Sequence, residues 1–117
     1  MTELTVFENL FQDGLPDREF EPFREGVEIF WLATGEPDVA LLRYSLGAKV
    51  PYHRHVGTET ILVLSGSQSD ERGDYPKGTF IVNAAGTEHS VWSEEGCIVL
   101  VQWQRPVEFI DTPIAKS

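Results

Sequence analysis

From residue 27 onward, short runs of apolar residues alternate with turn residues. The runs are rich in Val, Ile, Leu, Phe and Trp, which favour β-strands, and Gly, Pro or Asp residues separate most of them. This part has no sustained 3.6-residue apolar period of the kind that an amphipathic helix requires. We therefore predict nine strands, over residues 27–33, 39–46, 49–55, 59–64, 68–71, 79–83, 88–93, 98–105 and 107–110. Many short strands at near-regular spacing are typical of a β-sandwich or β-barrel.

The first 26 residues lack this pattern, and a short helix within residues 4–13 is the one regular element expected there. Five apolar side chains are expected to hold this extension on the barrel or on a second subunit: Phe7, Leu10, Phe11, Phe20 and Phe23. The length of 117 residues suits one domain. We predict a single domain over residues 1–117, with an extension over 1–26 and a barrel over 27–110.

The composition is acidic, with 19 Asp and Glu against 9 Lys and Arg and a formal charge of −10. Proteins bind nucleic acids by neutralising phosphates with cations, so we expect no nucleic-acid partner. No apolar run approaches the roughly 20 residues of a membrane helix, and the N-terminus does not have the pattern of a signal peptide. We therefore expect no membrane partner. The single cysteine, Cys97, cannot form an internal disulfide, and we expect a cytoplasmic protein because free thiols are usual in a reducing compartment.

All three histidines of the chain fall in or beside predicted strands. His53 and His55 are two residues apart, so both imidazoles point to the same face of a strand. After a turn, an antiparallel strand is expected to carry Glu59 back beside them, and His89 arrives from a later strand. Three imidazoles and a carboxylate suit Zn, Fe, Mn, Ni or Cu better than Mg or Ca. The alternative is that these are ordinary polar residues, since a His-x-His pair alone is a weak signal.

The wider spacing around these histidines resembles the two motifs of the cupin superfamily. The first motif is matched at each fixed position, by Gly47, His53, His55, Glu59 and Gly66. The second is matched by Gly78, Gly86 and His89. Ala84 and Ser93 stand where the family usually has Pro and Asn. These departures affect the shape of a turn and an outer contact, and leave the expected ligands unchanged.

More narrowly, residues 20–104 resemble the ChrR-like cupin domains found at the C-terminal end of some anti-sigma factors. The resemblance rests on three stretches of sequence: FREGVEIFWL, ALLRYSLGAKVPYHRHVGTETILVLSG and SDERGDYPKGTFIVNAAGTEHSVWSEEGC. The resemblance implies an all-β fold, a small double-sheet jelly-roll β-barrel. It also implies a homodimer and one divalent transition metal on His53, His55, Glu59 and His89, with zinc ahead of iron, manganese or nickel.

The anti-sigma factors carry a separate N-terminal zinc domain that holds the sigma factor. About 20 residues without Cys or His stand in that place here, so we do not expect a complete regulator of that kind.

Five further residues are candidates for the pocket or for outer contacts of the ligands: Arg43, Tyr44, Trp92, Cys97 and Trp103. Arg43 and Tyr44 are neighbours on a strand, so at most one points inward. Arg43 would anchor an anionic substrate or stay solvated, and Tyr44 would place its hydroxyl at the barrel mouth or pack at its rim. Trp92 and Trp103 would pack in the core or stack on a substrate. Cys97 would be a small buried hydrophobe, a redox-sensitive thiol or a fifth ligand.

Other positions are assigned by simple alternation and polarity. Barrel-lining side chains are expected at Ile61, Val63, Phe80, Ile98 and Leu100. The acidic stretches at residues 69–74 and 94–95 are expected to be solvated turns.

Three functions remain open at this point, and the last in rank is a homodimeric scaffold with no catalysis. The first is a metal-dependent enzyme, an oxygenase, isomerase or hydrolase acting on a small molecule, because open metal positions can polarise a carbonyl, activate water or, with iron, accept oxygen. The second is a non-catalytic zinc-binding sensor or interaction module, because a closed tetrahedral site is structural. The negative charge disfavours an anionic ligand. No separate acid or base is evident, so no catalytic residue is assigned.

Overall fold

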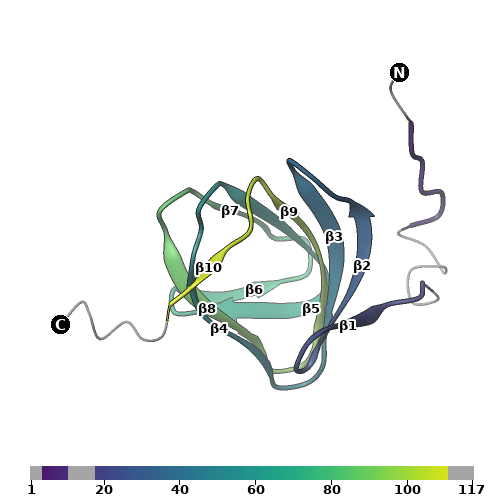
Figure 1. Ribbon diagram of the computed structural model, residues 1–117. Helices are drawn as coiled ribbons and strands as arrows, with labels where there is room; N and C mark the ends of the chain where they lie inside the picture. Colours follow the sequence, from purple (N-terminus) through teal and green to yellow (C-terminus); the bar gives the residue numbers. More distant parts are fainter. Residues whose placement is uncertain (1–3, 11–17, 111–117) are drawn as a thin grey trace.

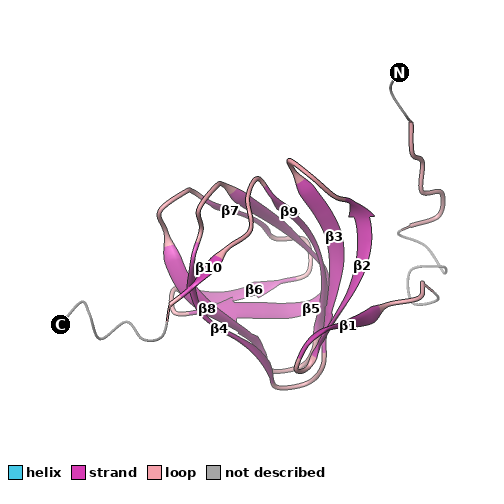
Figure 2. Cartoon of the chain, in the orientation of Figure 1, coloured by secondary structure: helices cyan, strands magenta, loops and turns pink. Residues whose placement is uncertain are grey.

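The computed structural model describes residues 4–10 and 18–110, and every regular element in this part is a β-strand (Figure 2). The strands are β1 (Glu21–Arg24), β2 (Val27–Ala33), β3 (Asp38–Tyr44), β4 (Ala48–Arg54), β5 (Glu59–Asp70), β6 (Gly73–Pro76), β7 (Phe80–Asn83), β8 (Glu88–Ser93), β9 (Cys97–Trp103) and β10 (Glu108–Phe109). They run in the order β1-β2-β3-β9-β5-β8-β4-β10, with β6 and β7 also paired to β5. This antiparallel sheet curls on itself into a half-barrel (Figure 1), which confirms the predicted all-β barrel.

Strand β5 joins the two walls of the half-barrel. Its first residues pair with β7 and β9, and its last residues pair with β6 and β8. We call the wall of β1, β2, β3, β9, β7 and the start of β5 the first wall. The wall of β4, β6, β8, β10 and the end of β5 is the second wall. One strand therefore links both walls, and side chains at its two ends reach the same interior.

Several predicted strand boundaries were wrong. The strands expected at 59–64 and 68–71 form one strand, β5, which passes through Gly66 with φ 71° and has a register shift against β9 between Val63 and Ser65. Strands β1 and β6 were not predicted. The helix expected within residues 4–13 is not present in residues 4–10, and residues 11–13 lie outside the described part. Within the described residues, no helix has the length and apolar character needed to cross a membrane.

The core lies between the two walls and consists of alternate strand residues. Its fully buried members include Val27, Ile29, Val63, Val99 and Val101. Burying one such side chain stabilises the fold by roughly 1.5–3 kcal/mol.

The expected barrel lining is confirmed only in part. Ile61 and Val63 are buried in the core. Phe80 was assigned wrongly, because Ile81 is the residue of β7 that packs on the core, and alternation turns Phe80 outward, where it is 61% exposed. Ile98 and Leu100 are half-buried and lie outside the core for the same reason.

Candidate metal centre

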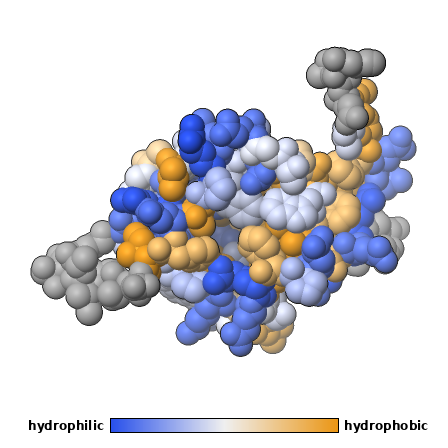
Figure 3. Space-filling view, viewed as in Figure 1, coloured by the Kyte–Doolittle hydropathy of each residue, from blue (hydrophilic) through white to orange (hydrophobic). Residues whose placement is uncertain are grey.

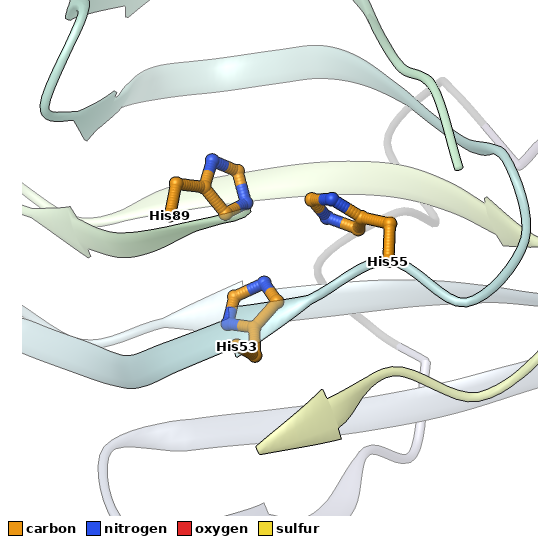
Figure 4. A group of neighbouring side chains, drawn as sticks. All are labelled: His53, His55 and His89. Carbon is orange, nitrogen blue, oxygen red and sulfur yellow. The ribbon is translucent and has the colours of Figure 1, made fainter. Parts of the chain in front are cut away.

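Three histidines from two neighbouring strands meet inside the half-barrel (Figure 4). His53 lies on β4 and is paired in register with His89 on β8, while His55 follows directly after β4. One ring nitrogen from each residue lies within 4.8 Å of the others, and all three side chains are buried. Backbone hydrogen bonds tie His55 to the turn before β8, from His55 N to Thr87 O and from Gly86 N to His55 O. The imidazole of His55 is thereby held beside the other two.

The outer nitrogen of each imidazole has its own acceptor. Nδ1 of His53 donates to the Pro51 carbonyl at 2.7 Å, and Nδ1 of His55 donates to the Thr87 carbonyl at 3.0 Å. Nδ1 of His89 lies 2.9 Å from Oδ2 of Asp70. A carbonyl or an ionised carboxylate can only accept, so the proton of each neutral ring sits on Nδ1. The lone pair therefore remains on Nε2, the form in which imidazole binds metals.

Two of the three inner nitrogens, Nε2 of His55 and Nε2 of His89, are buried and form no hydrogen bond within the described residues. Buried polar atoms are rarely left in this state, because the lost solvation is not repaid. Burial also lowers the pKa of His53 and of His89, so these rings are neutral at pH 7 and available as ligands. These nitrogens fit a transition-metal ion.

Glu59, at the start of β5, points its carboxylate at the same centre. Its Oε1 is 3.0 Å from Nε2 of His55 and accepts a hydrogen bond from Nδ2 of Asn83 at 3.0 Å. Burial acts to raise the pKa of Glu59, but the neighbouring His55 outweighs it and the pKa lies below its usual value. A lone pair facing a carboxylate at this distance requires a positive charge. A proton on His55 would meet that need but would leave Nε2 of His89 unpaired, whereas a bound metal ion would satisfy both.

The route by which Glu59 reaches the centre differs from the one expected. We expected β4 and β5 to form a hairpin, but β8 lies between them in the sheet. Glu59 belongs to the part of β5 that pairs with β7 and β9 in the first wall. The four expected ligands thus come from both walls, and a shared ion would tie the walls together.

A second layer of polar residues links His89 to Glu59. Arg72 Nη2 donates to Asp70 Oδ2 at 2.8 Å and to Asn83 Oδ1 at 2.9 Å, while Asn83 donates to Glu59. Tyr75 donates its hydroxyl to Asp70 Oδ1 at 2.9 Å. Burial acts to raise the pKa of Asp70, but Arg72 and the other donors hold it at about 2, so the carboxylate is ionised and keeps His89 protonated at Nδ1.

Sequence reasoning missed this layer. Residues 69–74 were expected to be a solvated turn, which is wrong for Ser69 and Asp70, 3% and 5% exposed. Both belong to the end of β5, the part that we predicted as a separate strand over residues 68–71. Asp70 and Asn83 lie outside the motif spacing, and alternation continued from the inward Glu59, Ile61 and Val63 would have turned Asp70 outward. No local signal in the sequence therefore identified this layer.

A cavity of about 300 Å³ adjoins the centre. Apolar side chains from both walls supply most of its lining, and His53 and Glu59 reach it. Tyr44 and Trp103, two of the five pocket candidates, also line it. Burial raises the pKa of Tyr44 far above its usual value, so its phenol is neutral. The cavity is therefore a mainly apolar space with a few polar groups near the candidate metal site.

The other three candidates lie elsewhere. Arg43 binds Oε1 of Glu28 at 2.6 Å and lies over the ring of Phe20, on the outer face that alternation gave it. Trp92 is half-buried between the inward residues Val91 and Ser93 and is not among the residues that line the cavity.

Cys97 is buried at the opposite end of β9 from Trp103, the residue paired in register with Glu59. Six residues at about 3.3 Å each separate Cys97 from Trp103 by about 20 Å. Burial raises the pKa of the Cys97 thiol to about 11, as for a small buried hydrophobe. Its position does not favour a role as fifth ligand.

Comparison with known proteins agrees with this geometry. The family model described as the ChrR cupin-like domain matches residues 15–107. The chain belongs to the ChrR cupin-like family. The anti-sigma-E factor ChrR of Cereibacter sphaeroides is 33% identical over 98 residues, which cover 81% of this chain and 46% of ChrR. This ChrR-like cupin therefore spans about half the length of that relative.

Solved structures show the same fold for this ChrR-like cupin. A chain in the crystal structure of Rhodobacter sphaeroides SigE in complex with the anti-sigma ChrR matches with a TM-score of 0.70 and 33% identity, covering 76% of this chain and 51% of that one. An acetylacetone dioxygenase from Acinetobacter johnsonii matches with a TM-score of 0.75 and 15% identity, covering 95% of this chain and 78% of that one. At that identity the second match establishes the cupin fold alone.

Proposed function

We propose that this ChrR-like cupin binds one divalent transition metal through His53, His55, Glu59 and His89 and acts on, or senses, a small organic molecule in the adjoining cavity. The observation that carries the proposal is the convergence of three buried imidazoles whose outer nitrogens all donate to fixed acceptors. Zinc is the first choice of metal, because imidazole and carboxylate ligands suit it, and iron, manganese and nickel suit the same set.

The enzymatic form of the proposal is a dioxygenase-like reaction, an isomerisation or a hydrolysis. A bound metal would supply Lewis acidity or, as iron, oxygen activation. The protein's own contribution would be to hold the ligands rigidly, to keep Glu59 ionised beside Asn83, and to exclude water with the apolar walls. The cavity that reaches His53 and Glu59 supports this form, because a purely structural site needs no space beside it.

The alternative is a zinc-binding sensor or interaction module. The relationship to an anti-sigma factor, and to a chain in the structure of a sigma–anti-sigma complex, supports it. Four protein ligands would also complete the tetrahedral coordination of a zinc ion and leave no position for a substrate. X-ray absorption at the metal edge discriminates the two forms. Five or six ligands including water would favour the enzyme, and four protein ligands would favour the module.

Metal binding itself is tested by His55→Ala. Wild-type protein is expected to contain about one metal ion per chain by elemental analysis, and His55→Ala to lose most of it and to melt at a lower temperature, because residues from both walls share the ion. Lys49→Ala, at an exposed position on β4, is the matched control and is expected to keep its metal. Equal metal content in His55→Ala and wild type would overturn the proposal.

We further propose that two copies of the chain associate through the outer face of the first wall. A row of apolar residues crosses that face in register: Phe30, Leu41, Leu100, Leu62 and Phe80. Leu41 is fully buried, and the rings of Phe7 and Phe20 pack near Phe30, so Leu100, Leu62 and Phe80 are the members that a second copy would reach. The row ends in the exposed Phe80, and Val82 on the same strand is also exposed. Apolar side chains gathered on one face are typical of an interaction site. Sedimentation velocity is expected to give the mass of two chains, and a monomer mass would contradict the proposal.

We propose the cytoplasm as the working compartment. Cys97, the only cysteine in the chain, is a buried free thiol, as is usual for proteins in a reducing environment. Cell fractionation tests this, and recovery in a membrane or extracellular fraction would contradict it.

A further inference from the structure

Each wall of the cavity carries an aromatic residue beside an expected ligand. On the first wall, Trp103 of β9 is paired in register with Glu59 of β5. On the second wall, Phe109 of β10 is paired in register with His53 of β4, and the two rings lie 5.8 Å apart. Trp103 and Phe109 both line the cavity. The cavity beside the expected ligands is therefore lined by an aromatic side chain from each wall.

The aromatic surface of the first wall is larger than one ring. Phe23 of β1 stacks on Trp103 with ring centres 6.1 Å apart, and Trp31 of β2 lies 6.3 Å from each of them. Phe23 and Trp31 are partly exposed, at 42% and 36%, although both line the cavity. In Figure 3, a hollow near the centre of the face is bordered by orange and pale side chains. Phe23 and Trp31 therefore leave part of this aromatic surface open to a ligand, while Trp103 itself is 9% exposed.

The charged groups that line the cavity are few, and carboxylates outnumber cations among them. Arg24 is the only Lys or Arg among the lining residues, and its guanidinium lies 4.6 Å over the ring of Phe109. Oδ1 of Asp38 accepts a hydrogen bond from Gly35 N at 2.7 Å. Glu59 belongs to the expected ligand set. Apart from a bound metal ion, Arg24 is the one cation among the described lining residues, and the carboxylates of Asp38 and Glu59 oppose it for an anionic molecule. A molecule rich in hydroxyl groups would lose hydrogen bonds to water against the apolar walls.

The remaining polar pair is neutral. Tyr44 and Gln68 are both buried, both line the cavity and interact with each other. They offer a ligand a hydroxyl and an amide, and neither brings a charge. The volume of about 300 Å³ lies at the lower end of the range for small-molecule pockets, which limits the ligand to about two fused rings.

We propose that the cavity binds a planar, uncharged, mainly apolar molecule between Trp103 and Phe109, with its polar end directed at His53 and Glu59. This deepens the proposed function and rests on it for the role of the polar end. The stacking surface itself is built from residues that are not expected ligands, so it can be tested separately from metal binding.

The test is calorimetric titration of metal-loaded protein with 2-naphthol, a planar neutral probe. Decahydro-2-naphthol has the same skeleton without the planar rings, and 2-naphthoate adds a negative charge. We expect 2-naphthol to bind at least about tenfold more tightly than either comparison molecule. Trp103→Leu and Phe109→Leu each remove an aromatic face and should weaken 2-naphthol binding by roughly threefold to tenfold. Trp92→Leu, a tryptophan that does not line the cavity, should leave it unchanged.

Three outcomes would overturn the inference: no binding of 2-naphthol to metal-loaded protein, equal or tighter binding of either comparison molecule, or unchanged affinity in Phe109→Leu. Phe109 is 49% exposed on the last strand, so its substitution tests the inference even when Trp103→Leu does not fold. Metal content is measured on the same samples. If the protein contains no metal but binds 2-naphthol through the aromatic residues, the inference stands and the proposed metal site fails. If the protein contains metal but does not bind 2-naphthol, the metal site stands and the inference fails.

Discussion

The three histidines are oriented by two chemically different kinds of acceptor. His53 and His55 donate to backbone carbonyls of Pro51 and Thr87, which are part of the chain's own path. His89 instead donates to the side chain of Asp70. A carbonyl acceptor survives side-chain substitution, but a side-chain acceptor does not. Asp70 is therefore the one of these three acceptors that a side-chain substitution can remove.

We predict that Asp70→Ala lowers metal affinity by about 10- to 100-fold, the usual cost of losing an acceptor behind a ligating imidazole. Without the carboxylate, the ring of His89 loses its orienting hydrogen bond, and Arg72 loses its contact on the same side. Competition with a chelator of known affinity measures the change. Asp74→Ala, an exposed carboxylate nearby, should bind metal like the wild type. Equal affinity in both variants would mean that Asp70 does not support the site.

At the scale of elements, β5 decides whether the two walls meet correctly. Its start carries Glu59 and its end carries Asp70, so the expected ligand set and the second layer both depend on its path. Gly66 stands between these ends with φ +71°, and a Cβ atom built there would lie 2.0 Å from the carbonyl oxygen of Gly96. The backbones of β5 and of the turn before β9 can approach this closely only because residue 66 has no side chain.

Gly66→Ala is therefore predicted to be strongly destabilising. The left-handed conformation costs an alanine about 1–2 kcal/mol, and the steric overlap adds about 1–3 kcal/mol. Gly47→Ala is the matched control, because Gly47 has φ +76° with nothing within 4 Å of the added Cβ, so it should show the conformational cost alone. Urea unfolding of both variants gives the two free energies. Equal destabilisation would show that β5 shifts freely to relieve the overlap.

For the whole molecule, the buried histidines couple folding to pH. Burial lowers the pKa of His53 and His89 in the folded, metal-free protein, whereas both rings titrate near 6.5 in the unfolded chain. Below that pH the unfolded chain therefore holds more protons than the folded one, and folded stability is lost as the pH falls.

We predict that the free energy of unfolding of the metal-free protein, held in a chelator, is level above about pH 7 and falls as the pH drops below about 6.5. Urea titrations at successive pH values measure it. His53→Gln should reduce the slope, because one of the two titrating groups is removed. A slope that is unchanged in this variant, or a stability that rises on acidification, would contradict the assignment.

Local patterns in the sequence were sufficient for the fold class, most of the strands, the family and the expected ligands. Alternation over residues 27–33 and 88–93 predicted β2 and β8 with their observed bounds. The spacing from His53 to Glu59 and on to His89 indicated a site before any fold was known. Such features need only neighbours along the chain, because the two-residue period of a strand and the turn preference of glycine are local properties.

The tertiary structure alone decided which distant strands meet. It placed β8 between β4 and β5, brought Asp70 and Asn83 behind the expected ligands, and set Trp103 beside Glu59. Strand order and cross-strand register join residues far apart in the chain, and no local period encodes them. The sequence by itself therefore determined that a cupin metal site is expected, and the folded sheet decided what surrounds it.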